Sequence, residues 1–182
     1  MIEYIVIAII IVLLLIIVYY YNKLNVLSNI IDNSWAQIDV QLKKRTDLVP
    51  NLVETVKGYA AHEKSIFEDV ANARAKMMSA QTIEEKDKAG NMLASTLKSL
   101  FAIAENYPEL KANQNFLMLQ EELSGIENKI AYARQHYNDT VLEFNNLVTT
   151  LPGSLFAGMF GKKTRKYLEI TAAEREVVKV KF

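Results

Sequence analysis

The sequence predicts an all-α protein: an N-terminal transmembrane helix followed by an antiparallel, up-and-down four-helix bundle. Three observations support this fold class. The first 22 residues are almost wholly apolar, apolar residues then recur at helical spacing as far as Leu151, and no segment alternates as a half-buried strand does. We therefore expect an anchor at residues 1–22, a helical bundle at 23–151 and a C-terminal tail at 152–182.

The anchor is predicted from a run of 19 residues without a charge that ends at Asn22. At 1.5 Å per residue such a helix is roughly 28 Å long, close to the thickness of a bilayer core. We place the transmembrane segment between Tyr4 and Tyr21, because tyrosines at its end are typical of the membrane interface. The alternative is a cleaved signal peptide. An acidic Glu3, no basic stretch before the apolar run and no small-residue cleavage site argue against it.

The distribution of cations suggests the orientation. Only Glu3 precedes the apolar run, whereas Lys23 follows it and further cations come at 43–45. The positive-inside tendency then favours a single-pass protein of the cytoplasmic membrane with its bundle in the cytoplasm. Of these cations only Lys23 is near the membrane, so the sequence leaves the side of the membrane open.

The bundle is predicted from apolar residues three and four apart. The first helix carries them at Ile31, Trp35, Ile38, Leu42, Val49, Leu52, Val56 and Tyr59. Pro50 interrupts this pattern without changing its phase, so we expect a kink there and not an end. Whether the helix turns near 58–62 or continues as one rod is left open. A turn is favoured, because the lengths of the ascending and descending helices then nearly cancel and the last helix ends beside the membrane.

The later helices have clear start signals. A second apolar series runs from Ile66 to Met77. Thr82 with Glu85 has the spacing of a capping box and opens a third helix. Pro108 suits the first position of the last helix, which is expected to continue to about Leu151.

Two polar residues, Arg45 and Glu63, fall on the apolar seam of the first helix. One interpretation is a buried polar network that fixes helix register and includes Asp47 and Asn51. The other is that both side chains extend to solvent from the edge of the seam. The sequence does not decide between them.

Composition excludes several classes of function. The chain has no cysteine, which rules out disulfides, thiolate nucleophiles and cysteine zinc sites. Its 21 basic and 21 acidic residues argue against a nucleic-acid partner. His62-Glu63 begins like a zinc-protease motif, but Ile66 stands where the second histidine is needed. We expect no catalytic, cofactor-binding or metal-binding residues and hence no enzyme.

Three groups of segments carry a family resemblance. They are QLKKRTDLVPNLVETVKGYAAHE at 41–63, ENYPELKANQNFLMLQEELSGIENKIAYARQHYN at 105–138, and FAGMFGKKTRKYLE at 156–169 with VKVKF at 178–182. Val141, Phe144 and Asn145 follow the second. Together, behind one hydrophobic helix, they resemble the LemA family. The resemblance implies a membrane-anchored helical bundle, and it brings no catalytic residues, cofactor or substrate.

The tail combines apolar and basic residues. We expect a membrane-surface contact from Phe156, Phe160, Lys162, Lys163, Arg165 and Lys166, with aromatic rings at the interface and cations on anionic headgroups. The alternative is that the apolar residues cap the end of the bundle and the cations are solvated.

These features favour a non-enzymatic, membrane-anchored scaffold or adaptor. Its expected partners are the lipid bilayer and an unidentified membrane or membrane-proximal protein, and a homo-oligomer is left open. A second hypothesis is a membrane-organising or lipid-contacting protein that acts through the tail. A bundle enzyme with a hidden site is a third, for which no residue speaks.

Overall fold

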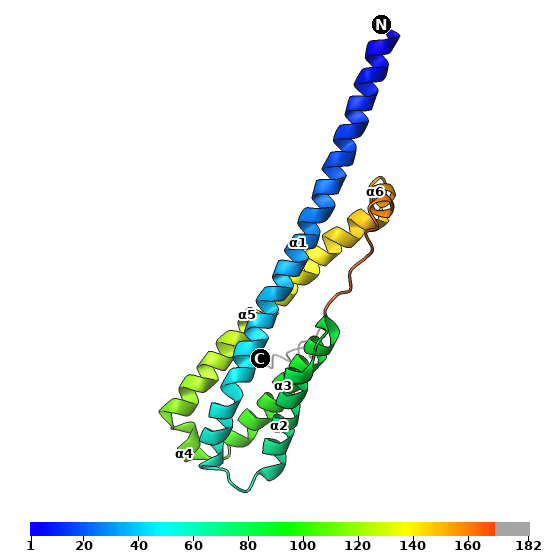
Figure 1. Cartoon of the computed structure of the whole chain (residues 1–182). Coiled ribbons are helices and arrows are strands. Elements are labelled where there is room, and N and C mark those ends of the chain that lie inside the picture. The colour runs from blue at the N-terminus through cyan, green and yellow to red at the C-terminus, as the bar shows by residue number, and fades with distance from the viewer. Residues whose placement is uncertain (170–182) are drawn as a thin grey trace, which may run out of the picture. The chain divides into compact units, whose positions relative to one another are not determined.

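The computed structural model describes residues 1–169, and these form α-helices joined by turns (Figure 1). The helices are α1 (Ile2–Lys57), α2 (Lys64–Ser79), α3 (Ile83–Ala104), α4 (Pro108–Lys111), α5 (Gln114–Thr149) and α6 (Gly153–Met159). No strand occurs in residues 1–169, so the all-α class is confirmed. The end of the predicted tail, including VKVKF, lies outside the described residues.

The chain divides into two compact units, to both of which α1 and α5 contribute. Of the described residues, unit 1 contains Met1–Ala36 and Ala133–Tyr167, and unit 2 contains Gln37–Tyr132 with residues 168–169. The units therefore divide the long helices at Ala36 and Tyr132, whereas the bounds expected from hydropathy and turn residues lie at 22 and 151.

The first turn of unit 2 shows whether the first helix ends near residues 58–62 or continues as one long rod. α1 ends at Lys57, and α2 begins only at Lys64, so the chain turns where the sequence favoured a turn. Pro50 lies inside α1, which continues past it as expected.

The start of α3 is a complete capping box. The backbone N–H of Glu85 donates to the Thr82 hydroxyl at 3.2 Å, and the Glu85 carboxylate accepts from the backbone N–H of Thr82 at 3.0 Å. This confirms the predicted signal. Hydrogen bonds from the backbone N–H groups of Gln81 and Thr82 lower the pKa of the Glu85 carboxyl, because they stabilise its charged form.

The predicted start of the last helix needs a correction. Pro108 does begin a helix, but that helix, α4, ends at Lys111, and the long helix α5 begins at Gln114. The cause is Asn113, whose side-chain oxygen accepts from the backbone N–H of Phe116 at 3.1 Å and so caps the new helix.

The core of unit 2 follows the spacing that the sequence shows. Its buried apolar residues on α1 are Ile38, Leu42, Val49, Leu52 and Val56. Those on α2 and α3 are Ile66, Phe67, Val70, Ala73, Met77, Ala89, Leu93, Leu97, Leu100 and Ala104, and α5 adds Phe116, Leu123, Ile126 and Ile130. Polar contacts join the helices at their edges: Lys86 on α3 pairs with Asp39 on α1 at 2.7 Å, and Arg74 on α2 donates to the backbone oxygen of Thr46 at 3.2 Å.

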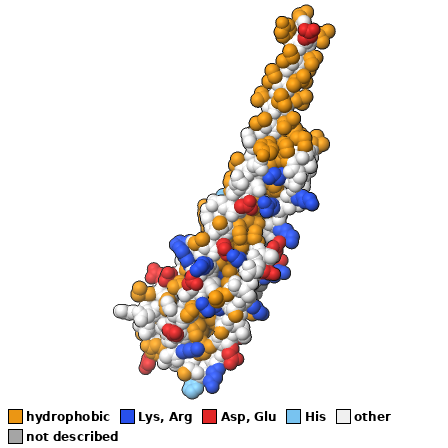
Figure 2. Space-filling view, viewed as in Figure 1, with side chains coloured by type: hydrophobic (Ala, Val, Ile, Leu, Met, Phe, Trp, Pro, Cys, Tyr) orange, Lys and Arg blue, Asp and Glu red, His pale blue; other side chains and the backbone are white. Residues whose placement is uncertain are grey.

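Unit 1 contains the apolar start of α1. Hydrophobic side chains cover the visible face of this part of the helix (Figure 2), and almost all of those between Tyr4 and Tyr19 are exposed. Among the described residues, α1 is the one helix long and apolar enough to cross a membrane. Further along, unit 1 has a small core of Leu24, Leu27 and Ile31 from α1, Tyr137, Val141 and Phe144 from α5, and Ala157 from α6.

Candidate membrane-contact site

A sharp turn after α5 brings α6 alongside the apolar start of α1. The peptide bond between Leu151 and Pro152 is cis, and Gly153 begins α6. A Cβ at Gly153 would collide with the carbonyl oxygen of Leu147, so this close approach requires glycine. Pro152 lines a hollow of about 420 Å³ together with apolar side chains of α1 between Val12 and Tyr20.

Two aromatic pairs hold α6 to α1. The ring of Phe156 stacks on Tyr20, with centroids 4.7 Å apart and planes 13° from parallel. Phe160 meets Tyr21 edge-on at 5.1 Å. The two phenylalanines predicted to touch the membrane therefore contact the tyrosines at the end of the predicted transmembrane segment.

The basic segment after α6 continues along α1. Gly161 has a φ of 65°, a left-handed conformation that favours glycine, and it turns the chain out of α6. The Lys162 ammonium then donates to the Asn25 side chain at 2.8 Å. The Arg165 guanidinium donates to the Ser28 hydroxyl at 3.2 Å and lies 3.6 Å from the Asp32 carboxylate.

Helix α5 fixes the backbone of this segment. The Asn145 side chain donates to the backbone oxygen of Arg165 at 2.9 Å and accepts from its backbone N–H at 2.8 Å. The Tyr137 hydroxyl donates to the backbone oxygen of Lys166 at 3.4 Å. These bonds hold the backbone in place and leave the Lys163, Arg165 and Lys166 side chains exposed.

The arrangement orders chemical groups along α1 as a membrane interface does. Apolar side chains come first, the aromatic pairs at Tyr20 and Tyr21 follow, and the cations lie beside Asn25 to Asp32. Leu155 and Met159 are 67% and 59% exposed on α6. An exposed apolar helix face followed directly by cations is typical of interfacial segments.

The predicted polar network has one member in the core of unit 2. Arg45 is 2% exposed, and its guanidinium donates to the Glu127 carboxylate on α5 at 2.7 Å and to the backbone oxygen of Gly90 on α3 at 2.7 Å. A Cβ at Gly90 would come within 3.1 Å of this guanidinium, so glycine provides its space. Arg45 thereby links α1, α3 and α5.

The other three predicted members lie elsewhere. Asp47 is exposed and pairs with Lys43 at 3.2 Å, and Asn51 is also exposed. At 100° per residue both point more than 100° away from Arg45 around α1, which explains their separation. Glu63 follows the end of α1, so the helical register does not extend to it; its carboxylate accepts from the Tyr107 hydroxyl at 3.1 Å. This hydrogen bond is the main cause of the raised pKa of Tyr107.

The sequence did not predict the partner of Arg45 or the residue that holds the basic segment after α6. Glu127 is 82 positions from Arg45, and nothing local in the chain connects the two. Asn145 did have a signal, because it belongs to the residues that carry the family resemblance, but its role as a backbone clamp was not foreseen. Within residues 1–169, no group of three or more histidine or acidic side chains could hold a metal ion.

Comparison with known proteins identifies the family. A profile of the LemA family matches residues 34–182. The chain belongs to the LemA family. Magnetosome protein MamQ of Magnetospirillum gryphiswaldense is 24% identical over 158 residues, which cover 72% of this chain and 58% of MamQ. Magnetosome protein MamQ 2 of Paramagnetospirillum magneticum is 24% identical over 157 residues, with the same coverage.

A third relative is Protein LemA of Metamycoplasma hominis, 25% identical over 133 residues that cover 71% of this chain and 59% of the relative. This LemA-family chain thus spans less than two thirds of the length of these curated relatives. The family and the relatives carry names that are not those of enzymes. With the apolar helix α1, they indicate a membrane-associated helical protein.

Proposed function

We propose that this LemA-family protein is a non-enzymatic scaffold of the cytoplasmic membrane. The first 22 residues anchor it in a single pass, and unit 2 is an antiparallel, up-and-down four-helix bundle that presents its outer faces to a protein partner in the cytoplasm. The observation that carries the proposal is the continuity of α1. One unbroken helix contains the apolar segment and supplies Leu42, Leu52 and Val56 to the core of unit 2.

Exposed methionines on α2 and α3 support a protein-binding role. Met78 on α2 is 62% exposed, and the sulfur of Met92 on α3 lies 3.7 Å from the Lys76 ammonium. Methionine adapts its shape to different neighbours, and it is common on surfaces that bind proteins.

Site-specific crosslinking in cells tests the scaffold. A photoreactive amino acid replaces Met78 or Met92 in the full-length chain, and the same residue at Leu14 in the anchor is the control. We expect a protein adduct from position 78 or 92 that position 14 does not give. Adducts only with lipid, or only with other copies of this chain, from all three positions would contradict the proposal.

The second candidate function is contact with anionic lipid through α6 and the basic segment after it. It is favoured by the aromatic pairs at Tyr20 and Tyr21 and by the exposed side chains of Lys163 and Lys166. A cation near a negatively charged membrane surface contributes about 1 kcal/mol, and salt weakens this attraction.

An environment-sensitive dye tests the lipid contact. The dye is attached to Leu155→Cys on α6 of the full-length chain in vesicles, and Met92→Cys is the control. We expect the emission of the dye at 155 to shift to shorter wavelength when anionic lipid is added, and added salt to reverse the shift. Equal spectra at 155 in neutral and anionic vesicles would contradict this function.

A further inference from the structure

One face of α5 in unit 2 carries exposed side chains between Met118 and Tyr132. We call it the α5 face, and it consists of the exposed residues Met118, Glu121, Glu122, Asn128, Lys129 and Tyr132 around the half-buried Gly125. At 100° per residue these seven lie within about 60° of Gly125 around the helix. The buried residues Leu123 and Ile130 lie on the opposite side, so the α5 face points away from the core.

Three residues of this face are unusual for a solvated helix surface. Met118 is 69% exposed and Tyr132 is 77% exposed. Between them, Gly125 stands in the middle of a long helix, where glycine destabilises relative to alanine. A Cβ at Gly125 would meet no atom of the described chain within 4 Å, so packing within the chain does not require the glycine. Because glycine has no Cβ, this position allows the backbone of a helix from another chain to approach closely.

The residues on either side of Gly125 match each other in chemistry. Positions four away are Glu121 and Lys129, which carry opposite charges. Positions three away are Glu122 and Asn128, a hydrogen-bond acceptor and a donor, and positions seven away are Met118 and Tyr132. A helix face with this property is complementary to its own copy turned end to end.

We propose that the α5 face joins two copies of this chain, with their α5 helices antiparallel about a two-fold axis at Gly125. Glu121 then meets Lys129 of the second copy twice, once on each side of the axis. Along the edges of the pair, Glu122 lies beside the same Lys129 and Glu121 lies beside the Asn128 amide of the second copy. The Met118 sulfur contacts the Tyr132 ring of the second copy, a favourable pairing. A parallel pair would place Glu121 against Glu121 and Lys129 against Lys129, and these like charges would repel.

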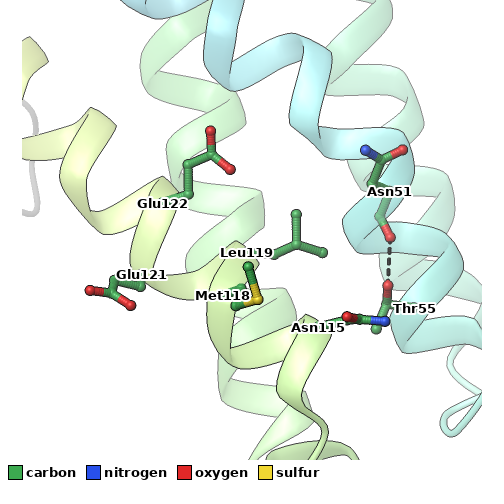
Figure 3. Close-up of a pocket in the computed structure, with 7 residues that line it drawn as sticks. All are labelled: Asn51, Thr55, Asn115, Met118, Leu119, Glu121 and Glu122. Atoms are coloured by element: carbon green, nitrogen blue, oxygen red, sulfur yellow. Dashed lines mark hydrogen bonds between the residues drawn. The ribbon is translucent and has the colours of Figure 1, made fainter.

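A groove beside the α5 face receives the largest side chain of the second copy. It has a volume of about 530 Å³ and is lined by Asn51 and Thr55 of α1 and by Asn115, Met118, Leu119, Glu121 and Glu122 of α5 (Figure 3). Leu119 points toward α1 across this groove in Figure 3. Tyr132 of the second copy lies opposite Met118 in the antiparallel pair, so its ring reaches the groove and its hydroxyl finds polar partners at the rim.

This inference goes beyond the proposed function, since the pairing of two copies requires neither a protein partner nor lipid. Seven side chains per copy make a small interface, so the pair is expected to be weak and reversible. Its symmetry is isologous: each contact occurs twice, once on each side of the axis at Gly125.

Cysteine crosslinking of the full chain in detergent micelles tests the antiparallel register, and the native chain contains no cysteine that would interfere. We expect an oxidant to crosslink Gly125→Cys with itself, and a mixture of Met118→Cys and Tyr132→Cys to form a mixed dimer. Met118→Cys alone should not crosslink, because its two copies lie about 21 Å apart, far beyond disulfide reach. Ser124→Cys, exposed beside Gly125, is the control and should crosslink far less.

Charge reversal provides an independent measurement of the same pairing. Glu121→Lys and Lys129→Glu should each weaken self-association in micelles at least about tenfold, because each replaces two attractive pairs by two repulsive ones. The double variant should restore it. Self-crosslinking of Met118→Cys together with none at Gly125→Cys, or a double variant no tighter than the single ones, would overturn the proposal.

Discussion

Replacing Arg45 by methionine removes the central polar contact of unit 2 while keeping an unbranched side chain of similar volume. The guanidinium gives up two hydrogen bonds of 2.7 Å, one to the Glu127 carboxylate and one to the backbone oxygen of Gly90. Methionine fills most of the space and needs no partner, so the change isolates the polar contribution from the packing contribution.

The expected loss is worked from the burial of each group. A hydrogen bond to a charged group contributes about 1.5–3 kcal/mol when both partners are buried. The bond to Gly90 lies in the core, whereas the Glu127 side chain is 43% exposed and can be solvated after the change. Burial of the guanidinium had a cost that methionine does not have. We therefore expect Arg45→Met to lower the free energy of unfolding by about 2 kcal/mol, and Arg45→Ala by about 4 kcal/mol because it also leaves a cavity.

Urea unfolding of the full-length chain in detergent micelles, followed by circular dichroism, measures both losses. A loss of about 2 kcal/mol moves the midpoint by about 1 M urea at the slope usual for a domain of this size. Lys43→Met is the control, because its pair with Asp47 is exposed and is expected to contribute less than about 0.5 kcal/mol. A midpoint for Arg45→Met equal to or above that of the native chain would refute the reasoning.

Three further changes have defined outcomes. The pKa of Glu85 is lowered, so the stability that its carboxylate contributes is present above the ordinary pKa of 4.5 and is lost as the pH falls through the lowered value. Glu85→Gln should reduce this loss of stability at acid pH in thermal melts. An unchanged loss would contradict the capping bond. The pKa of Tyr107 is raised, so its hydrogen bond to Glu63 stabilises the folded chain below pH 10.0, and this stability is lost as the pH rises through the raised value. Tyr107→Phe should remove this loss of stability at alkaline pH. Thermal melts of the variant that keep the loss would count against the bond. In Gly153→Ala the new methyl group would collide with the Leu147 carbonyl oxygen and should move α6. A disulfide between Tyr20→Cys and Phe156→Cys should therefore form readily with glycine at position 153 and poorly with alanine. Equal yields of the disulfide would contradict the close approach.

Features governed by local physics were predictable from the sequence. The capping box at Thr82 and Glu85 depends on a spacing of three residues, and the buried face of α1 depends on a helical period, so both could be read from one chain. The turn after Lys57 also followed, because it was favoured by matching helix lengths.

Features that depend on distant parts of the chain were not predictable. The spacing marked Arg45 as a polar residue on the seam, but its partners Gly90 and Glu127 lie on other helices, where no pattern in the sequence points to them. The aromatic and basic residues of the tail were recognised by their chemistry. Their contacts with Tyr20 and Asn25 depend on how α6 packs on α1, which a single sequence does not encode in any local signal.

Labelling of single cysteines in vesicles most directly tests the central claim, that the apolar start of α1 lies within the membrane. The full-length chain carries either Val12→Cys in that segment or Met92→Cys on α3, and each is treated with a maleimide that does not cross membranes. We predict that Met92→Cys reacts in every outward-facing copy, whereas Val12→Cys reacts only after the chain is denatured. Labelling of Val12→Cys in intact vesicles at the rate of Met92→Cys would contradict the account.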